Sequence, residues 1–161
     1  MPAWLDALLA TTGTLLLGPP DADAERRALL ERIAAGLRQA FPDVPTVEAE
    51  ALLQRLGEPG LTLVDVREPH ERAVSTLPGA VPLDDAPATG PLVCYCTIGW
   101  RSGLAARRLR QRGVDAHNLP GSVLLWTHVG GPLVHDGAPT RSVHVWDARW
   151  SLAASAFEAV W

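Results

Sequence analysis

The residues with the clearest chemical potential lie in one stretch, 92–103, which reads LVCYCTIGWRSG. Cys96 follows a short apolar run typical of a buried strand, and a helix is predicted to begin at Ser102. A turn between a strand and a helix directs several backbone N–H groups and the positive end of the helix at one point. A thiol at that point is favoured as the thiolate, which is the attacking form. We therefore predict that Cys96 is a nucleophile.

Two other residues of the loop suit an anionic substrate. Arg101 carries a permanent charge and a forked set of donors that matches a tetrahedral or planar anion, although a structural ion pair with a carboxylate is the alternative. Gly99 permits turns that a side chain would forbid. Trp100 is interpreted as either a pocket wall or a cap over the loop.

Other reactive side chains are given structural roles. Cys94 lies inside the predicted strand, which favours packing over a role as a second thiol. Asp65 and Arg67 are expected to make fixed hydrogen bonds and ion pairs at a strand end that support the loops. No metal is expected, because a single Cys-x-Cys is a weak zinc signal and the five histidines, His70, His117, His128, His135 and His144, show no metal-ligand spacing.

Composition excludes several classes of protein. All fourteen basic side chains among the 161 residues are arginine, so Schiff-base, pyridoxal phosphate and Walker-A chemistry, which need lysine, are ruled out. The net charge of −4 gives no general attraction to nucleic acid or an anionic membrane. Two cysteines are too few for a disulfide scaffold, which indicates reduced thiols and a cytoplasmic location.

The N-terminal residues, 1–43, are predicted to form a helical extension. Apolar residues recur at helical spacing before a Gly-Pro-Pro break, and again from Leu29 to Phe41, with a helix end before Pro42. The stretch up to Gly18 has no basic leading region and is interpreted as neither a signal peptide nor a membrane span. Its apolar stripe is expected to pack on the rest of the molecule.

From residue 44 the pattern changes to that of an α/β domain, predicted over 44–135. Short apolar runs alternate with helical stretches, which indicates a mostly parallel sheet. Strands are expected at 61–66, 79–83, 91–95 and 115–119, and helices at 48–56 and 102–112. A C-terminal extension, 136–161, is predicted to hold a strand at 142–146 after an Asp-Gly turn and a final helix at 151–161.

Four motifs, in order over about Val44 to Leu133, resemble those of the rhodanese-like sulfurtransferase family. They are Asp65-Val66-Arg67-Glu68 at a strand end, Pro78-Gly79-Ala80, the cysteine loop, and Leu119-Pro120-Gly121-Ser122 with Trp126 and Gly131-Pro132. Two details depart from the family pattern: Ser75-Thr76-Leu77 lacks the histidine often found there, and Ser122 replaces a second glycine. The resemblance implies a rhodanese-like fold, a central mostly parallel sheet flanked by helices, with helical extensions at both ends.

The resemblance also implies a chemistry. Four residues separate Cys96 from Arg101, as in the sulfurtransferases, whereas the related phosphatases and arsenate reductases use five, so a phosphatase or arsenate reductase is the less favoured alternative. On this basis Cys96 carries sulfane sulfur as a persulfide in a ping-pong reaction and needs no cofactor. The donor would be thiosulfate or a persulfide, and the acceptor a thiol or a protein. The residues expected to bind substrate are Thr97, Ile98, Gly99, Trp100, Arg101 and Ser102.

A different class of function is also open to this sequence. The same fold could act as a binding or regulatory module with little turnover, through its N-terminal arm or a basic helix that carries Arg107, Arg108, Arg110 and Arg112. A solvated helix face is the plainer interpretation of those arginines. The apolar arm, with Phe157 and Trp161, could also serve a homo-oligomer interface.

Overall fold

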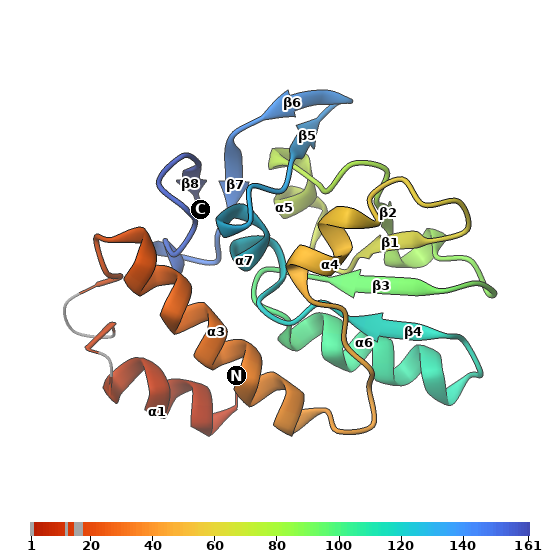
Figure 1. Cartoon of the computed structure of the whole chain (residues 1–161), viewed down its shortest axis with the longest axis horizontal. Helices are drawn as coiled ribbons and strands as arrows, with labels where there is room; N and C mark the ends of the chain where they lie inside the picture. Colours follow the sequence, from red (N-terminus) through yellow and green to blue (C-terminus); the bar gives the residue numbers. More distant parts are fainter. Residues whose placement is uncertain (1, 12, 15–17) are drawn as a thin grey trace.

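A computed structural model describes residues 2–11, 13–14 and 18–161 of the chain. The rest of the predicted N-terminal extension lies outside the described residues. At the centre is a parallel sheet of four strands, β1 (Thr62–Asp65), β2 (Val81–Pro82), β3 (Leu92–Tyr95) and β4 (Ala116–Asn118), in the order β2-β1-β3-β4 (Figure 1). Every residue of β3 is buried, as expected for the middle of a covered parallel sheet. The sheet confirms the predicted fold class.

Helices cover the sheet and connect its strands. Four of them belong to the sheet region, α4 (Ala49–Gln54), α5 (Pro69–Val74), α6 (Trp100–Gln111) and α7 (Ser122–His128), and a 3₁₀ turn, η1 (Leu83–Asp85), follows β2. Helix α6 packs on β3 and β4, and α7 packs against α4. Helix α6 begins two residues earlier than predicted, so Trp100 and Arg101 lie in its first turn and not in the loop.

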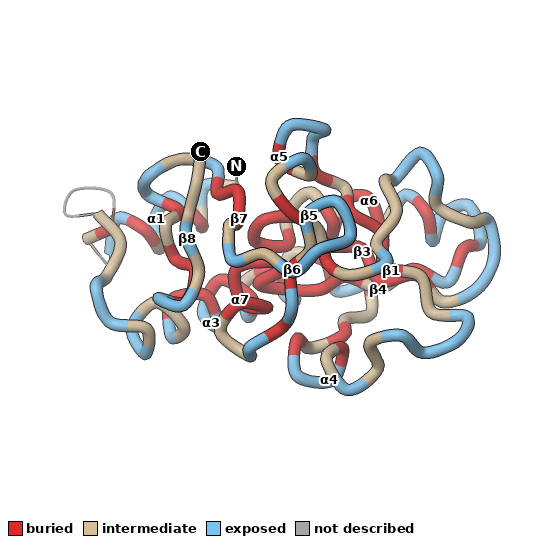
Figure 2. Tube along the Cα trace, turned by 90° about the horizontal axis from the view of Figure 1, so that it is seen from above, coloured by how far each residue is buried: buried red, intermediate tan, exposed pale blue. Residues whose placement is uncertain are grey.

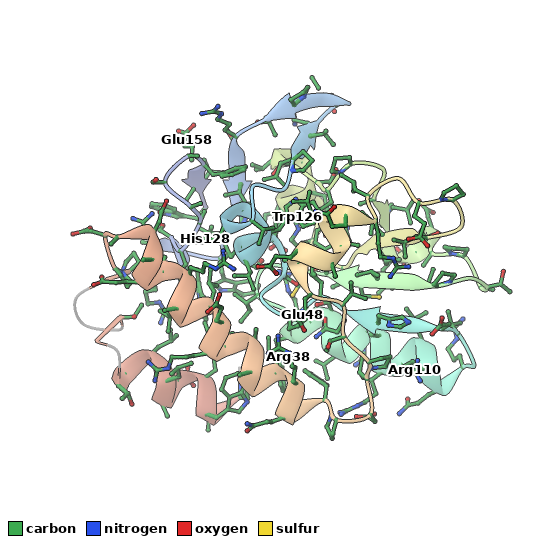
Figure 3. All side chains as sticks on the ribbon, viewed as in Figure 1. Arg38, Glu48, Arg110, Trp126, His128 and Glu158 are labelled. Carbon is green, nitrogen blue, oxygen red and sulfur yellow. The ribbon has the colours of Figure 1, made fainter. Side chains whose placement is uncertain are left out.

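The N-terminal extension packs on this domain as predicted. Helix α3 (Asp23–Ala40) contacts α7, and α1 (Ala3–Thr11) contacts α3. Their apolar faces join the common core through buried leucines and an isoleucine, Leu5, Leu9, Leu29, Leu30, Ile33 and Leu37. In addition, Arg38 of α3 and Glu48 point toward one another and form an ion pair ahead of α4 (Figure 3).

The prediction of a C-terminal helix over 151–161 is wrong. The chain instead forms a 3₁₀ turn, η2 (Ala148–Trp150), an irregular stretch and a strand, β8 (Glu158–Val160), which pairs in parallel with β7 (Ser142–His144). Three consecutive residues of the irregular stretch, 152–154, are buried. Their main chain is bound by other elements: His128 donates to the Leu152 carbonyl at 2.7 Å, and Thr127 Oγ1 accepts from the Ala154 N–H at 2.9 Å.

A second correction concerns the Asp136-Gly137 turn. It joins β5 (Leu133–His135) to β6 (Ala138–Thr140) in an antiparallel hairpin, whereas β7 belongs to a different pair of strands. Figure 2 shows that this hairpin is largely exposed and that buried residues concentrate along α7 and the central strands. Within the described residues, no helix combines the length and the apolar character needed to cross a membrane.

Candidate active site

Cys96 lies immediately after β3, at the edge of the sheet where the parallel strands end, and is only 1% exposed. The backbone N–H of Gly99 donates to its Sγ atom at 3.1 Å, and the hydroxyl of Ser102 lies 3.5 Å from the same sulfur. Gly99 has a φ of 109°, which a residue with a side chain rarely adopts. The loop therefore folds back over the sulfur at a position that requires glycine.

The loop changes the ionisation of this sulfur. Burial opposes the thiolate, but the charge of Arg101, the Ser102 hydroxyl and the backbone N–H groups of Ser102 and Gly99 outweigh it and lower the pKa of Cys96 below its ordinary value. Cys94, two residues earlier in β3, shows the contrast. Burial and the neighbouring Cys96 raise the pKa of Cys94 to about 12, so this thiol stays protonated.

A set of buried side chains holds the loop from below. The hydroxyl of Ser122 accepts from the Cys96 N–H at 3.0 Å and donates to the Leu119 carbonyl at 2.8 Å. Asn118 accepts from the Ser102 hydroxyl at 2.7 Å and donates to the Gly99 carbonyl at 3.0 Å. Each of these hydrogen bonds fixes one point of the turn around the sulfur.

Arg101, the predicted anion-binding residue, is placed in an ion pair with Glu71 of α5. Two of its nitrogens lie 2.6 and 2.7 Å from the two carboxylate oxygens, and a further hydrogen bond at 3.1 Å reaches the Thr97 hydroxyl. Burial favours the neutral acid, but Arg101 and the backbone N–H of Glu68 lower the pKa of Glu71 to about 2. The charge of Arg101 is therefore shared between the cysteine and a carboxylate that is ionised at neutral pH.

Asp65 and Arg67, the predicted supporting residues, form a second and fully buried ion pair. Arg67 donates to the Asp65 carboxylate at 2.7 and 3.0 Å and to the Ser75 carbonyl at 2.6 Å. The Tyr95 hydroxyl donates to Asp65 at 2.6 Å and accepts from the Leu77 N–H at 3.0 Å. This network ties the end of β1 to the end of β3, and its members do not reach the pocket described next.

A pocket of about 310 Å³ opens above Cys96. Its floor is the loop and the first turn of α6, with Cys96, Thr97, Ile98, Trp100 and Arg101. Its roof comes from outside the α/β domain: Asp6 and Leu9 of α1 on one side, and Trp146, Arg149 and Trp150 of the C-terminal segment on the other. Gly99 and Ser102, also predicted to bind substrate, lie beneath the sulfur and not along the pocket wall.

Several residues of this site were not found by reasoning from the sequence. A signal for Glu71 was present in the sequence, because Glu68 and Glu71 have the spacing of a capping box and Pro69 between them favours a helix start. The structure shows this capping box at the start of α5. Ser122 carried a signal only as the residue that replaces a second glycine of the family pattern; its φ of 45° is unusual for a residue with a side chain, and only the fold brings its hydroxyl to the Cys96 N–H. The roof residues come from segments far from the loop in sequence.

Comparison with known proteins agrees with this architecture. A family model described as the rhodanese-like domain matches residues 48–128. The structure resembles the rhodanese-like domain from Anabaena sp., with a TM-score of 0.52, 24% identity and coverage of 58% of this chain and 80% of that one. It also resembles thiosulfate sulfurtransferase from Pseudomonas aeruginosa, with a TM-score of 0.53, 19% identity and coverage of 71% and 24%. The chain belongs to the rhodanese-like family.

One curated relative matches in sequence. The chain is 39% identical over 66 residues to a tRNA sulfurtransferase of Desulfurococcus amylolyticus, a match that covers 38% of this chain and 14% of that protein. This chain thus spans only a small part of the relative's length. The matched family region contains the pocket floor, and both halves of the roof lie outside it.

Proposed function

We propose that this protein is a sulfurtransferase that carries sulfane sulfur on Cys96. The observation that supports the proposal most directly is the surroundings of the Cys96 sulfur, where the backbone N–H groups of the loop and the charge of Arg101 lower the pKa of the thiol. The same donors that favour the thiolate would favour the persulfide anion that replaces it. Membership of the rhodanese-like family and the match to a tRNA sulfurtransferase support the same reaction class.

The proposed reaction has two balanced half-reactions. In the first, the Cys96 thiolate attacks the outer sulfur of the donor, the donor's sulfur–sulfur bond breaks, and the remainder leaves with the bond electron pair. Cys96 then holds the outer sulfur as a persulfide. In the second, a thiolate acceptor attacks that outer sulfur, and the Cys96 thiolate is released. No net oxidation or reduction occurs in the protein, so no cofactor is required.

Intact-mass measurement tests this proposal. The protein is incubated with thiosulfate and, in parallel, with a thiosulfonate anion, and its mass is compared before and after. Wild type is expected to gain the mass of one sulfur atom, and Cys96→Ser is expected to gain none. Cys94→Ala is the matched control, because the high pKa of Cys94 leaves that thiol unreactive, and this variant is expected to load like wild type.

Two results would overturn the proposal. Equal loading of wild type and Cys96→Ser would show that the sulfur sits elsewhere. Failure of every donor to load wild type would leave the fold as a binding module without transfer chemistry. In the expected case, the rate of loading falls on the acid side as Cys96 becomes protonated, with a midpoint below the ordinary thiol value, because burial is outweighed by Arg101 and the loop donors.

A further inference from the structure

The roof of the pocket is aromatic. Trp146 is 59% exposed and stands at the pocket wall with its ring 5.0 Å from the Arg101 guanidinium carbon, and Trp150 is nearly buried beside it. Trp100 and Ile98 face them from the floor, and Leu9 contributes from α1. Three indole rings around one nucleophile create a site whose affinity comes from apolar and ring contacts.

The cations that face the pocket are already paired. Arg101 lies 2.6 Å from Glu71, and Arg149 lies 2.6 Å from Asp147. A further carboxylate, Asp6, lines the pocket, and it adds to the effect of Asp147 in raising the pKa of Arg149. A small dianion that enters would therefore meet at least as many negative charges as positive ones, and it gains little from Coulomb attraction.

The roof is fixed by contacts with the rest of the fold. Asp23 at the start of α3 accepts from the Ser155 N–H and hydroxyl, both at 2.8 Å, and Arg26 donates to the Ala153 carbonyl at 3.1 Å. On α1, the Trp4 ring packs against α3 so closely that a Cβ at Gly36 would lie 2.6 Å from it. Both halves of the roof are thus bound to α3, and the pocket is formed before a ligand arrives.

From these three observations we infer that the sulfur donor or acceptor that fits this pocket is a low-molecular-weight organic thiol derivative with an apolar, ring-sized body. The sulfur end reaches Cys96, and the body lies among Trp100, Trp146 and Trp150. A pocket of about 310 Å³ suits such a molecule. The inference rests on the proposed function, since it names the substrate class of the same site.

Two donors with the same reacting group isolate this effect. Benzenethiosulfonate and methanethiosulfonate are both monoanions in which the Cys96 thiolate would attack the outer sulfur and a sulfinate would leave with the electron pair. They differ only in the group next to the sulfonyl, which is a phenyl ring in benzenethiosulfonate and a methyl group in methanethiosulfonate. The quantity to measure is the ratio of kcat/KM for the two donors, with cyanide as the acceptor in both assays. Because both donors are monoanions, the charge of Arg101 affects both values of kcat/KM equally and cancels in the ratio.

Trp146→Ala is the test variant, because its exposed side chain can be truncated without opening the core. We expect the ratio of kcat/KM for benzenethiosulfonate to that for methanethiosulfonate to fall about tenfold, because the loss of one contact between aromatic rings has about this effect on binding. Trp161→Ala removes another exposed tryptophan that does not line the pocket, and its ratio is expected to match wild type. Thermal unfolding of the three proteins checks that the fold is unchanged.

The possible failures are distinguishable. If both donors load Cys96 and the ratio is the same in wild type and Trp146→Ala, the inferred substrate class is wrong while the proposed function stands. An equal fall in Trp161→Ala would also overturn the inference, because the effect would not belong to the pocket. If neither donor loads wild type, the proposed function itself fails.

Discussion

The floor and the roof of the pocket are built in different ways. The floor is a continuous segment, 96–101, held by backbone N–H groups, buried hydroxyls and an amide, and it lies within the region that matches the family. The roof is two separate segments, held by side chains of α3 and α7, and it lies outside that region. In the proposed function, the floor would therefore supply the reactivity and the roof the choice of substrate, from separate parts of this chain.

The largest effect should come from distorting the loop that carries the floor residues, with Gly99→Ala. A Cβ there would lie 2.9 Å from Leu37 Cδ1 and 3.1 Å from the Leu119 carbonyl, on a backbone whose φ of 109° disfavours any side chain. The displaced loop no longer aims its N–H groups at Cys96, so we expect the rate of persulfide loading to fall about 100-fold. Stopped-flow or quenched mass measurement of loading gives this rate.

Gly113→Ala is the matched control for that variant. Gly113 follows the other end of α6, has a φ of 83° and has no atom within 4 Å of an added Cβ. Gly113→Ala therefore has the same kind of backbone strain but does not disturb the loop around Cys96. The rate of persulfide loading of this variant should stay near that of wild type. Similar rates in Gly99→Ala and wild type would show that the loop geometry is not what activates the cysteine.

A smaller effect is expected from the ion pair beneath the floor, with Glu71→Gln. The folded pKa of Glu71, about 2, lies below the ordinary value for an unfolded chain. Its carboxylate therefore stabilises the fold above that ordinary value, and the contribution is lost as pH falls toward 2. We expect Glu71→Gln to lower the free energy of unfolding at neutral pH by about 2 kcal/mol and to flatten its decline in acid.

Urea unfolding at several pH values measures the free energy of unfolding of wild type and Glu71→Gln. Glu58→Gln is the control, since Glu58 forms an exposed ion pair with Arg55 that water screens. If wild type and Glu71→Gln show parallel curves of stability against pH, the carboxylate of Glu71 does not have the role assigned to it.

The smallest effect on activity is expected from removing one negative charge near the roof, with Asp147→Asn. The asparagine oxygen can still accept from the Arg149 N–H, as the aspartate does at 2.8 Å, but the negative charge is gone. Arg149 then faces the pocket without its partner, and we expect kcat/KM for the thiosulfate dianion to rise about threefold. Steady-state assays at low ionic strength measure it, with Asp115→Asn as an exposed control outside the pocket. A fall, or an equal rise in the control, would contradict the charge argument.

The comparison also explains what the sequence could predict. The floor was predictable because its strand, turn and helix are contiguous, so residue order alone places Cys96 at a helix start. The roof was not, because burial of Trp150 and the shape of 151–157 depend on groups such as Asp23 and His128 that only the folded chain brings near. A helix was predicted there because alanines and a leucine favour helix locally, and tertiary contacts overrode that preference.

The order of synthesis gives the roof a further consequence. Helix α1 is synthesised before the loop around Cys96, and Trp146 and Trp150 follow Cys96 by about fifty residues. A nascent chain that reaches only the end of α7 holds every residue of the floor but only one side of the roof. Cys96 is therefore synthesised before Trp146 and Trp150, which line the opposite side of its pocket.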